Sequence, residues 1–217
     1  MIMKILIGTK NQAKAREMKE ILGEEFEIVS LADLPNAPDV EESGRTFEEN
    51  AKLKAEAYHD FSGLPTIADD GGFEIDVLGG EPGVLSRRWP SMAEVIEGKP
   101  WREATDEELV EMTLEKLSGM PRDLRSAHLT TVVAFFDGTR MLTARESVDG
   151  FVANKAAPIK EKGFPFRALF LLPQFGKLYQ DLTPDEHKEV NHRRRAWLRL
   201  REMIKAPAAK SVEGATV

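Results

Sequence analysis

The sequence contains no cysteine, which excludes disulfide bonds, thiolate catalysis and a zinc site built on cysteine. Histidine is scarce as well. The four histidines are dispersed at His59, His128, His187 and His192, and this spacing argues against a histidine metal cluster. A chain without cysteine is compatible with the reducing cytosol, so we expect a cytoplasmic location.

Long hydrophobic runs and an excess of basic residues are also missing. No apolar run approaches the ~20 residues that span a bilayer, and the opening residues, MIMKILIGTKNQAK, lack a signal-peptide pattern. The net charge is −7, whereas nucleic-acid binders usually carry a basic surface. The basic run at residues 192–195 is too short to reverse this balance. We therefore expect neither a membrane nor a nucleic acid as a partner.

The order of apolar and polar segments indicates the fold class. A chain of 217 residues is long enough for one large domain with a substantial core. Helices and strands interleave, and one long hairpin is expected in the second half, which favours an α/β fold with a mixed sheet. We expect one domain at residues 1–205 and a flexible tail at 206–217. The expected strands are 4–8, 26–31, 129–136, 140–148 and 168–172, and the expected helices are 13–22, 46–61, one from 105, one from 183 and 191–205.

Local signals mark several of these boundaries. Thr46, Thr105 and Thr183 each precede a glutamate by three residues, a capping box in which the hydroxyl and the carboxylate satisfy free amides reciprocally. Asp137 and Gly138 predict a two-residue hairpin turn. Residues 91–104 are polar and are expected to be irregular.

The stretch from Thr66 to Trp89, TIADDGGFEIDVLGGEPGVLSRRW, has the strongest chemical signature. A short apolar run leads into Asp69 and Asp70, and the glycine pair that follows predicts a strand end and a turn. Because side chains alternate in an extended segment, the two carboxylates should point in opposite directions. A second turn at residues 79–83 brings in two arginines. This combination suits a magnesium-bound polyphosphate, although an acidic surface loop beside a hairpin has the same pattern.

The first loop, Thr9–Lys14, joins an expected strand to a helix N-terminus. Free amides and the helix dipole make such a turn a natural anion site, and Lys10 and Lys14 add positive charge. The glycines and the Lys-Ser/Thr pair of the P-loop are missing. An ordinary turn with solvated lysines has the same appearance, so the loop alone does not establish a phosphate site.

Five motifs follow one another along the chain: T-x-N-x-x-K at Thr9–Lys14, E-x-G-x-T-F-x-x-N-A-x-x-K-A at Glu42–Ala55, A-D-D-x-G at Ala68–Gly72, L-G-G-x-P-G-V-x-S at Leu78–Ser86 and H-R at His192–Arg193. In this order they resemble the ITPase (Ham1-like) family, whose members are pyrophosphatases of non-standard purine nucleoside triphosphates such as those of inosine and xanthosine. The resemblance covers about residues 3–203 and is looser in the last third. It implies an elongated mixed sheet flanked by helices, two lobes with a cleft between them, and a homodimer.

The resemblance also implies roles for individual residues. The reaction would release a monophosphate and pyrophosphate with Mg²⁺ as cofactor, or Mn²⁺ in its place. Glu41 and Asp70 would be the magnesium carboxylates, and Asp70 would also be the general base toward water. The residues implied to bind substrate are Thr9, Lys10, Asn11, Lys14 and Lys54 at the triphosphate, Gly71 where the family often has a serine, Arg88, and Phe164, Phe166, Arg167, Lys188, His192 and Arg193.

The chain departs from the family in its last third. Where the family commonly reads G-F-G-[YFW]-D-P-I-F, this sequence has GFPFRALF at 163–170. Arg167 replaces an acid with a base, and Pro165 removes a backbone donor. His187 aligns with a family lysine, with Lys188 adjacent, and Asn191 replaces a serine. The base specificity implied by the family is therefore open.

Two other interpretations fit the same sequence. The first is a Maf-type pyrophosphatase, which prefers modified pyrimidine nucleotides. The second is a nucleotide-binding protein without turnover, suggested by Arg167 and the weakened final motif. A panel of substrates separates the first from an ITPase, and tight binding of ITP without hydrolysis would identify the second.

Overall fold

The computed structural model describes residues 2–9, 12–89 and 102–206. Within this part of the chain the strands form one seven-stranded sheet with the order β2-β1-β3-β4-β5-β6-β7. β1 pairs in parallel with β2 and β3, whereas the other neighbours pair antiparallel. The expected α/β fold with a mixed sheet is confirmed. The strands are β1 (Met3–Ile7), β2 (Phe26–Ser30), β3 (Thr66–Ile75), β4 (Ser126–Phe136), β5 (Met141–Val152), β6 (Phe170–Leu172) and β7 (Lys177–Leu178).

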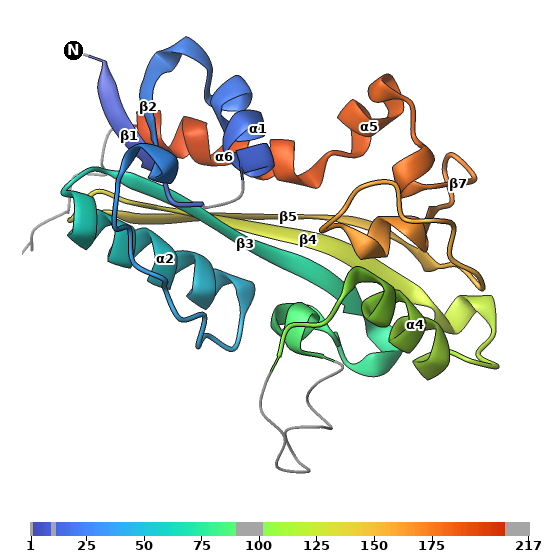
Figure 1. The fold of residues 1–217 in the computed structure, drawn as a ribbon. Coiled ribbons are helices and arrows are strands. Elements are labelled where there is room, and N and C mark those ends of the chain that lie inside the picture. Colours follow the sequence, from blue (N-terminus) through green and yellow to red (C-terminus); the bar gives the residue numbers. More distant parts are fainter. Residues whose placement is uncertain (1, 10–11, 90–101, 207–217) are drawn as a thin grey trace, which may run out of the picture.

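Helices cover both faces of the sheet (Figure 1). One face of β3 and β4 is covered by α2, whereas α6 packs on β4 and β5 from the other face and also contacts α1. α4 lies toward the end of the long strands β3 and β4 that is farther from β1. It contacts a short 3-10 helix, η6 (Pro165–Ala168). The helix bounds are α1 (Gln12–Leu22), α2 (Phe47–Ser62), α4 (Asp106–Lys116), α5 (Pro184–Val190) and α6 (His192–Lys205).

The strand-helix-strand opening is confirmed, with ends within a residue or two of those expected. The connection through α1 places β1 and β2 in parallel, as a helical crossover does. The apolar side chains of α1 are buried: Met18 and Leu22 are 0% exposed and Ile21 is 8% exposed.

The turn predicted at Gly71 and Gly72 is wrong. β3 continues through both glycines to Ile75, and all ten of its residues pair in register with β4, including Gly71 with Thr131 and Gly72 with Thr130. Glycine usually weakens a strand, but here the neighbouring strand supplies the hydrogen bonds. The turns expected at the next glycines are present, because Gly79, Gly80 and Gly83 all have positive φ angles.

Two of the three capping boxes are confirmed. The boxes of Thr105 with Glu108 and of Thr183 with Glu186 are complete in both directions. At α2 only half of the box forms. The Thr46 hydroxyl accepts the N–H of Glu49, but the Glu49 carboxylate accepts the N–H of Arg45 rather than that of Thr46.

The hairpin between β4 and β5 is present, but its loop is longer than predicted. The strands end at Phe136 and restart at Met141, so four residues connect them. The side chain of Asp137 accepts the backbone N–H groups of Thr139 and Arg140 and thereby stabilises the wider loop.

The last third follows the expected order with shifted ends. The strand expected at 168–172 starts at Phe170, because η6 occupies the residues before it. The helix expected from Asn191 is α6, and the Asn191 side chain caps it by accepting the N–H of Arg194. Of the irregular segment expected at 91–104, residues 91–101 lie outside the described residues, as do 207–217 of the expected tail.

The hydrophobic core divides along the long strands. One cluster gathers residues of the second half of β3 with residues of α4 and η6, including Phe73, Leu109 and Phe166. Two others lie on opposite faces of the first half of β3, where Ile67 packs toward α6 and Ala68 packs toward α2. The division into two lobes stays a prediction, but this arrangement leaves the middle of β3 and β4 between separate cores.

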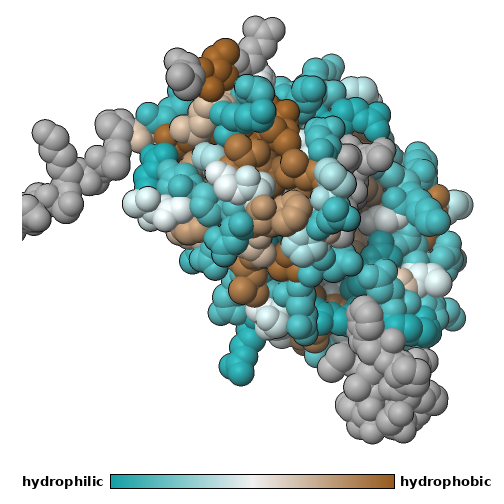
Figure 2. Space-filling model, turned by 60° about the vertical axis from the view of Figure 1, so that its left-hand side comes forward, coloured by the Kyte–Doolittle hydropathy of each residue, from teal (hydrophilic) through white to brown (hydrophobic). Residues whose placement is uncertain are grey.

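Part of the surface is apolar. Figure 2 shows hydrophobic side chains gathered on one face and framed by hydrophilic ones. The large hydrophobic residues with the most exposed surface are Ile2, Met3, Leu53, Phe61, Val77 and Leu124. Within the described residues, no helix is both long enough and apolar enough to cross a membrane.

Candidate active site

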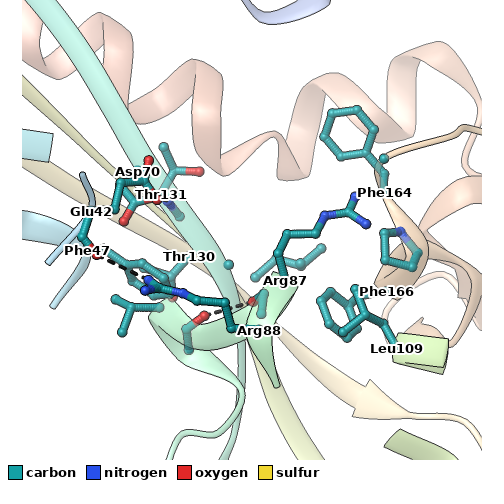
Figure 3. A pocket seen from close by; sticks show the side chains of 18 of the residues that line it. Glu42, Phe47, Asp70, Arg87, Arg88, Leu109, Thr130, Thr131, Phe164 and Phe166 are labelled. Carbon is teal, nitrogen blue, oxygen red and sulfur yellow. Dashed lines mark hydrogen bonds between the residues drawn. The ribbon is translucent and has the colours of Figure 1, made fainter. Parts of the chain in front are cut away.

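A cavity of about 1110 Å³ lies across the middle of β3 and β4. We call one part of its wall the carboxylate end (Glu41, Glu42, Lys54, Asp70) and another the aromatic end (Phe164, Phe166, Arg167, His192). Figure 3 shows Glu42 and Asp70 on one side, Phe164 and Phe166 on the other, and Arg87 and Arg88 between them. The predicted site residues that line the cavity are Glu41, Lys54, Asp70, Gly71, Arg88, Phe164, Phe166, Arg167, His192 and Arg193.

Asp70 reaches the cavity because β3 is extended at this point. As expected from side-chain alternation, Asp69 and Asp70 differ in surroundings: Asp69 is 3% exposed and does not line the cavity, whereas Asp70 does. Asp70 lies on the α2 side of the sheet, together with Ala68. Its Oδ1 also accepts the N–H of Gly71 at 2.9 Å. One carboxylate of the pair is therefore available to a ligand.

α2 contributes two polar side chains that lie one turn apart. Asn50 and Lys54 are four residues apart and so share a helix face. Asn50 Nδ2 donates to Asp70 Oδ2 at 3.0 Å, and Asn50 Oδ1 accepts the N–H of Gly44 at 2.8 Å. Lys54 Nζ lies 3.7 Å from Asp70 Oδ1. Asn50 was not among the predicted site residues. It belongs to the second motif, and its four-residue spacing from Lys54 was the feature of the sequence that could have indicated its contact with Asp70.

Glu42 is the second carboxylate at this end. Its Oε1 lies 2.6 Å from Nζ of Lys54. Burial and the neighbouring Glu42 charge raise the pKa of Asp70 above its usual value, outweighing the opposing effect of Lys54. Burial disfavours the charge of Lys54, but the carboxylates of Asp70, Asp69 and Glu42 outweigh it and raise the lysine pKa. The three side chains thus form one electrostatic group.

Sequence reasoning selected Glu41 rather than Glu42. Both line the cavity, but Glu41 is exposed, and the contact with Lys54 comes from Glu42. The segment has no regular secondary structure, so no periodicity indicated which of the two adjacent side chains faces inward. The family motif E-x-G begins at Glu42, and this was the available signal for the residue that contacts Lys54.

The end of β1 lies beside β3. Gly8 N–H bonds the carbonyl of Ile67 in β3 at 2.7 Å, which places Gly8 next to the strand that carries Asp70. Thr9 follows directly but is not among the residues that line the cavity. Lys10, Asn11 and the side chain of Lys14 lie outside the described residues, so their implied phosphate contacts stay predictions.

The paired glycines allow a close approach of neighbouring groups. A Cβ on Gly71 would collide with the carbonyl oxygen of Thr130, and one on Gly72 would lie 2.9 Å from the carbonyl oxygen of Gly83. The serine that the family often has at position 71 therefore does not fit between these strands as they stand. Thr130 and Thr131 also line the cavity, although no motif in the sequence indicated them.

Two arginines enter from η4, a 3-10 helix at Gly83–Arg88. Arg88 Nη2 donates to the carbonyl of Glu42 at 3.1 Å, which fixes the loop that bears the second carboxylate. Arg87 Nη1 donates to Asp106 Oδ1 at 2.6 Å. Sequence reasoning selected Arg88 only, yet both arginines line the cavity.

Phe164, Phe166 and Arg167 of the aromatic end come from η6 and the residue before it. The ring of Phe166 stacks on Phe73 at 4.8 Å and is 7% exposed, so one of its faces belongs to the core. The guanidinium of Arg167 lies 3.9 Å from the centre of the Phe164 ring and pairs with Glu161 at 2.5 Å. Arg167 therefore covers the ring of Phe164, which was expected to bind substrate.

The pair His192–Arg193 opens α6 and faces this end. Burial lowers the pKa of His192 well below its usual value, and the guanidiniums of Arg193 and Arg167 act in the same direction. His192 is therefore neutral at pH 7. Its Nδ1 is buried and has no hydrogen-bond partner among the described residues. Arg193 lies 3.6 Å from Glu17 and 5.8 Å from the centre of the Phe164 ring.

The neighbouring basic residues on α5 differ from each other. Lys188 is mostly exposed, pairs with Asp185 at 3.4 Å and is not among the residues that line the cavity. His187 packs edge-on against Tyr179 at 5.3 Å, and burial together with the charge of Arg167 lowers its pKa. Of the two, His187 is the side chain that lies near the aromatic end.

Comparison with known proteins gives a consistent result. The model of the Ham1 family matches residues 5–203 of the chain. A dITP/XTP pyrophosphatase from Lactobacillus acidophilus is 39% identical over 211 residues, which cover 94% of this chain and 97% of that protein. A dITP/XTP pyrophosphatase from Bacillus subtilis is 34% identical over 203 residues, or 93% and 96% of the two chains.

Solved structures agree with these matches. A HAM1 protein from Coxiella burnetii superposes with a TM-score of 0.80 at 29% identity, covering 94% of this chain and 98% of that one. The Ham1 protein of Staphylococcus aureus gives 0.78 at 30% identity, with 93% and 98% covered. The family resemblance inferred from the five motifs is thereby confirmed, and the chain belongs to the Ham1 family.

Proposed function

We propose that this chain hydrolyses non-standard purine nucleoside triphosphates, such as ITP, dITP and XTP, to the monophosphate and pyrophosphate. The observation that carries the proposal is the carboxylate end, where Glu42 and Asp70 face the amine of Lys54 inside a large cavity. The family of the chain and the printed activity of its relatives support the same reaction. The Maf-type alternative is not favoured, because the chain belongs to a different family.

The triphosphate is proposed to lie at the carboxylate end. Lys54 supplies a positive charge, because its raised pKa keeps the amine protonated at physiological pH. Arg88 also lines the cavity. Both offset the negative charge that develops on the leaving pyrophosphate. The first loop, with Thr9 and Lys10, is proposed to complete the phosphate site from the neighbouring strand.

The donor set fits a magnesium ion, and we propose Mg²⁺ as the cofactor. Among the described residues there is no group of three or more histidines and carboxylates arranged for a metal. Magnesium, however, is commonly bound by one or two carboxylates together with substrate phosphates and water. Glu42 and Asp70, which share Lys54 as a neighbour, would be the protein ligands, with Glu42 in place of the expected Glu41. When bound, the ion would neutralise phosphate charge.

Asp70 is proposed to act on the attacking water. The amide of Asn50 fixes Oδ2 and thereby orients the carboxylate that would accept the proton of the water. As the water attacks the α-phosphorus, its proton passes to Asp70. The bond from the α-phosphorus to the bridging oxygen breaks, and pyrophosphate leaves.

The base is proposed to lie at the aromatic end. A 6-oxo purine accepts hydrogen bonds where adenine donates them, so donors at His192 and Arg193 favour hypoxanthine and xanthine over adenine. Guanine shares the 6-oxo group, and the described contacts give no means of rejecting it.

A substrate panel tests the proposal. ITP, dITP, XTP, GTP, ATP and a modified pyrimidine triphosphate are incubated with and without Mg²⁺, and pyrophosphate is measured directly. We expect pyrophosphate from the first three with magnesium, and a loss of about 10³-fold in Asp70→Asn. Release of orthophosphate alone would exclude cleavage between the α- and β-phosphates. Binding of ITP without hydrolysis would establish the nucleotide-binding alternative.

A homodimer and a cytoplasmic location belong to the same proposal. Figure 2 shows apolar side chains gathered on one face, and large hydrophobic residues such as Leu53 and Phe61 are exposed; both observations support a surface that another subunit covers. The absence of cysteine favours the cytosol. Light scattering of the purified chain measures the oligomeric state, and a monomer at micromolar concentration would remove the dimer from the proposal.

A further inference from the structure

An ion pair connects three segments of the cavity wall. Arg87 Nη1 donates to Oδ1 of Asp106 at 2.6 Å, and Oδ2 of the same carboxylate accepts the backbone N–H of Gly163 at 2.6 Å. Arg87 lies in η4, Asp106 is the first residue of α4, and Gly163 directly precedes Phe164 of the aromatic end. One carboxylate therefore joins segments that lie 19 and 57 residues away in sequence. We call these three residues the clasp.

The clasp has the features of a specific contact. Asp106 is 9% exposed and occupies the first position of α4, where the free amides of the helix favour a negative charge. Both of its bonds are short, as charge-assisted hydrogen bonds are. Gly163 has φ of 90°, a conformation that favours glycine, so the direction of its N–H follows from the backbone.

Adjacent arginines bond to different parts of the wall. Arg88 reaches the carbonyl of Glu42 at the carboxylate end, and Arg87 reaches toward the aromatic end (Figure 3). Because both side chains start from one short helix, η4 sets the spacing between the two ends. A backbone bond also joins η4 to the segment before α4, since the N–H of Ala104 bonds the carbonyl of Arg87 at 2.8 Å.

We propose that Asp106 is a positioning residue for recognition of the nucleoside part of the substrate. It acts through Arg87 and the amide of Gly163 on the wall that bears Phe164 and Arg167. This inference rests on the proposed function, because it assigns the phosphates to the carboxylate end and the base to the aromatic end. Loss of the clasp weakens contacts with the nucleoside and leaves contacts with the phosphates unchanged.

The test compares a nucleotide with a bare phosphate chain. The variants are Asp106→Asn and Arg87→Met, alone and together, with Arg140→Met as control because Arg140 forms an ion pair of 2.8 Å with Asp137 in the hairpin loop. We expect KM for ITP to rise about tenfold in each clasp variant. The Kd of inorganic tripolyphosphate, measured by calorimetry, should change by less than about twofold. The double variant should be no worse than either single one.

Each outcome decides the matter. If the clasp variants lose affinity for ITP and tripolyphosphate equally, the clasp is a general structural contact and the proposal is wrong. An unchanged KM with a lowered Tm in the clasp variants would also overturn the proposal, because this is the result expected for the control Arg140→Met. If Asp106→Asn does not fold, Arg87→Met carries the comparison, because Arg87 is partly exposed. If the wild type releases no pyrophosphate, the proposed function fails, and the Kd of ITP replaces KM in the same test.

Discussion

The side chain of Asn50 bonds Asp70 and the backbone of Gly44 at the same time, at 3.0 and 2.8 Å. This buried amide thereby connects the loop that carries Glu42 to the strand that carries Asp70, the proposed general base. Asn50 is 0% exposed, so its amide bonds these two partners rather than bulk water. The orientation of Asp70 therefore depends on a residue of α2 that was not among the predicted site residues.

The first prediction concerns Asn50→Ala. Removing the amide leaves the Gly44 N–H and one Asp70 oxygen without this partner, so we expect a loss of about 1–3 kcal/mol of stability and a fall in kcat of about tenfold or more from misplacement of Asp70. Thermal unfolding and pyrophosphate release measure the two effects. Thr113→Val removes the buried bond from Thr113 to the carbonyl of Leu109 and is the matched control. If it lowers kcat as much, Asn50 has no specific role.

The second prediction separates the two adjacent glutamates. Glu42 contacts Lys54, whereas Glu41 is exposed, so Glu42→Gln should raise the magnesium concentration needed for half-maximal activity by about tenfold. Glu41→Gln should change it little. A magnesium titration of both variants gives the answer, and the opposite ranking would return the role to Glu41.

The third prediction concerns the serine of related proteins. Because the Cβ itself would collide with the carbonyl of Thr130, Gly71→Ser and Gly71→Ala should both lower stability, by about 1–3 kcal/mol. Denaturant unfolding measures the change. Equal losses in the two variants locate the cause at the Cβ, and a neutral Gly71→Ala would show that β3 and β4 separate without cost.

Much of the fold could be read from local pattern, because the elements are set by signals close in sequence. The buried face of α1 and the caps of α4 and α5 follow from periodicity and from Thr-x-x-Glu. The glycines of β3 were misread because their strand conformation depends on pairing with β4, more than fifty residues away. Taken alone, the two glycines disfavour a strand, but pairing with β4 outweighs this local preference.

Site residues could be predicted where regular secondary structure determines the direction in which a side chain points. Alternation in a strand predicted that Asp69 and Asp70 face opposite sides, and the family resemblance selected Asp70 and Lys54. Glu42 and Arg87 were missed because an irregular loop and a 3-10 helix give no rule for which side chain faces a cavity. The partners of Arg87, Asp106 and Gly163, lie in segments brought together only by the complete fold.

The fourth prediction concerns base preference. Xanthine carries an acidic imide and titrates to an anion near neutral pH, whereas hypoxanthine stays neutral, so the guanidinium of Arg167 should favour XTP over ITP. In Arg167→Gln the ratio of kcat/KM for XTP to that for ITP should fall about threefold to tenfold. Arg122→Gln is the control, because Arg122 also lies over an aromatic ring, that of Phe151, at 5.5 Å. An unaltered ratio would make Arg167 a structural residue held by Glu161 and Phe164.

The last prediction concerns the dependence of stability on pH. His192 is neutral in the folded chain because burial lowers its pKa well below 6.5, whereas the unfolded chain binds a proton near that value. Below about pH 6.5 the unfolded state therefore holds more protons, and stability falls as the pH falls. Between pH 7.5 and 5.5 the wild type should lose roughly 1 kcal/mol more than His192→Gln.

His128 provides a control of opposite sign. Burial disfavours its charge, but hydrogen bonds to Asp149 and Asp76 outweigh this and raise its pKa, so its stabilising effect is present at low pH and is lost as the pH rises through the folded value. Acidification should therefore destabilise His128→Gln more than the wild type, and His192→Gln less. Urea unfolding at a series of pH values measures both slopes. If His192→Gln and the wild type lose stability in parallel, the folded and unfolded chains bind the same number of protons at His192, and the lowering of its pKa by burial is wrong.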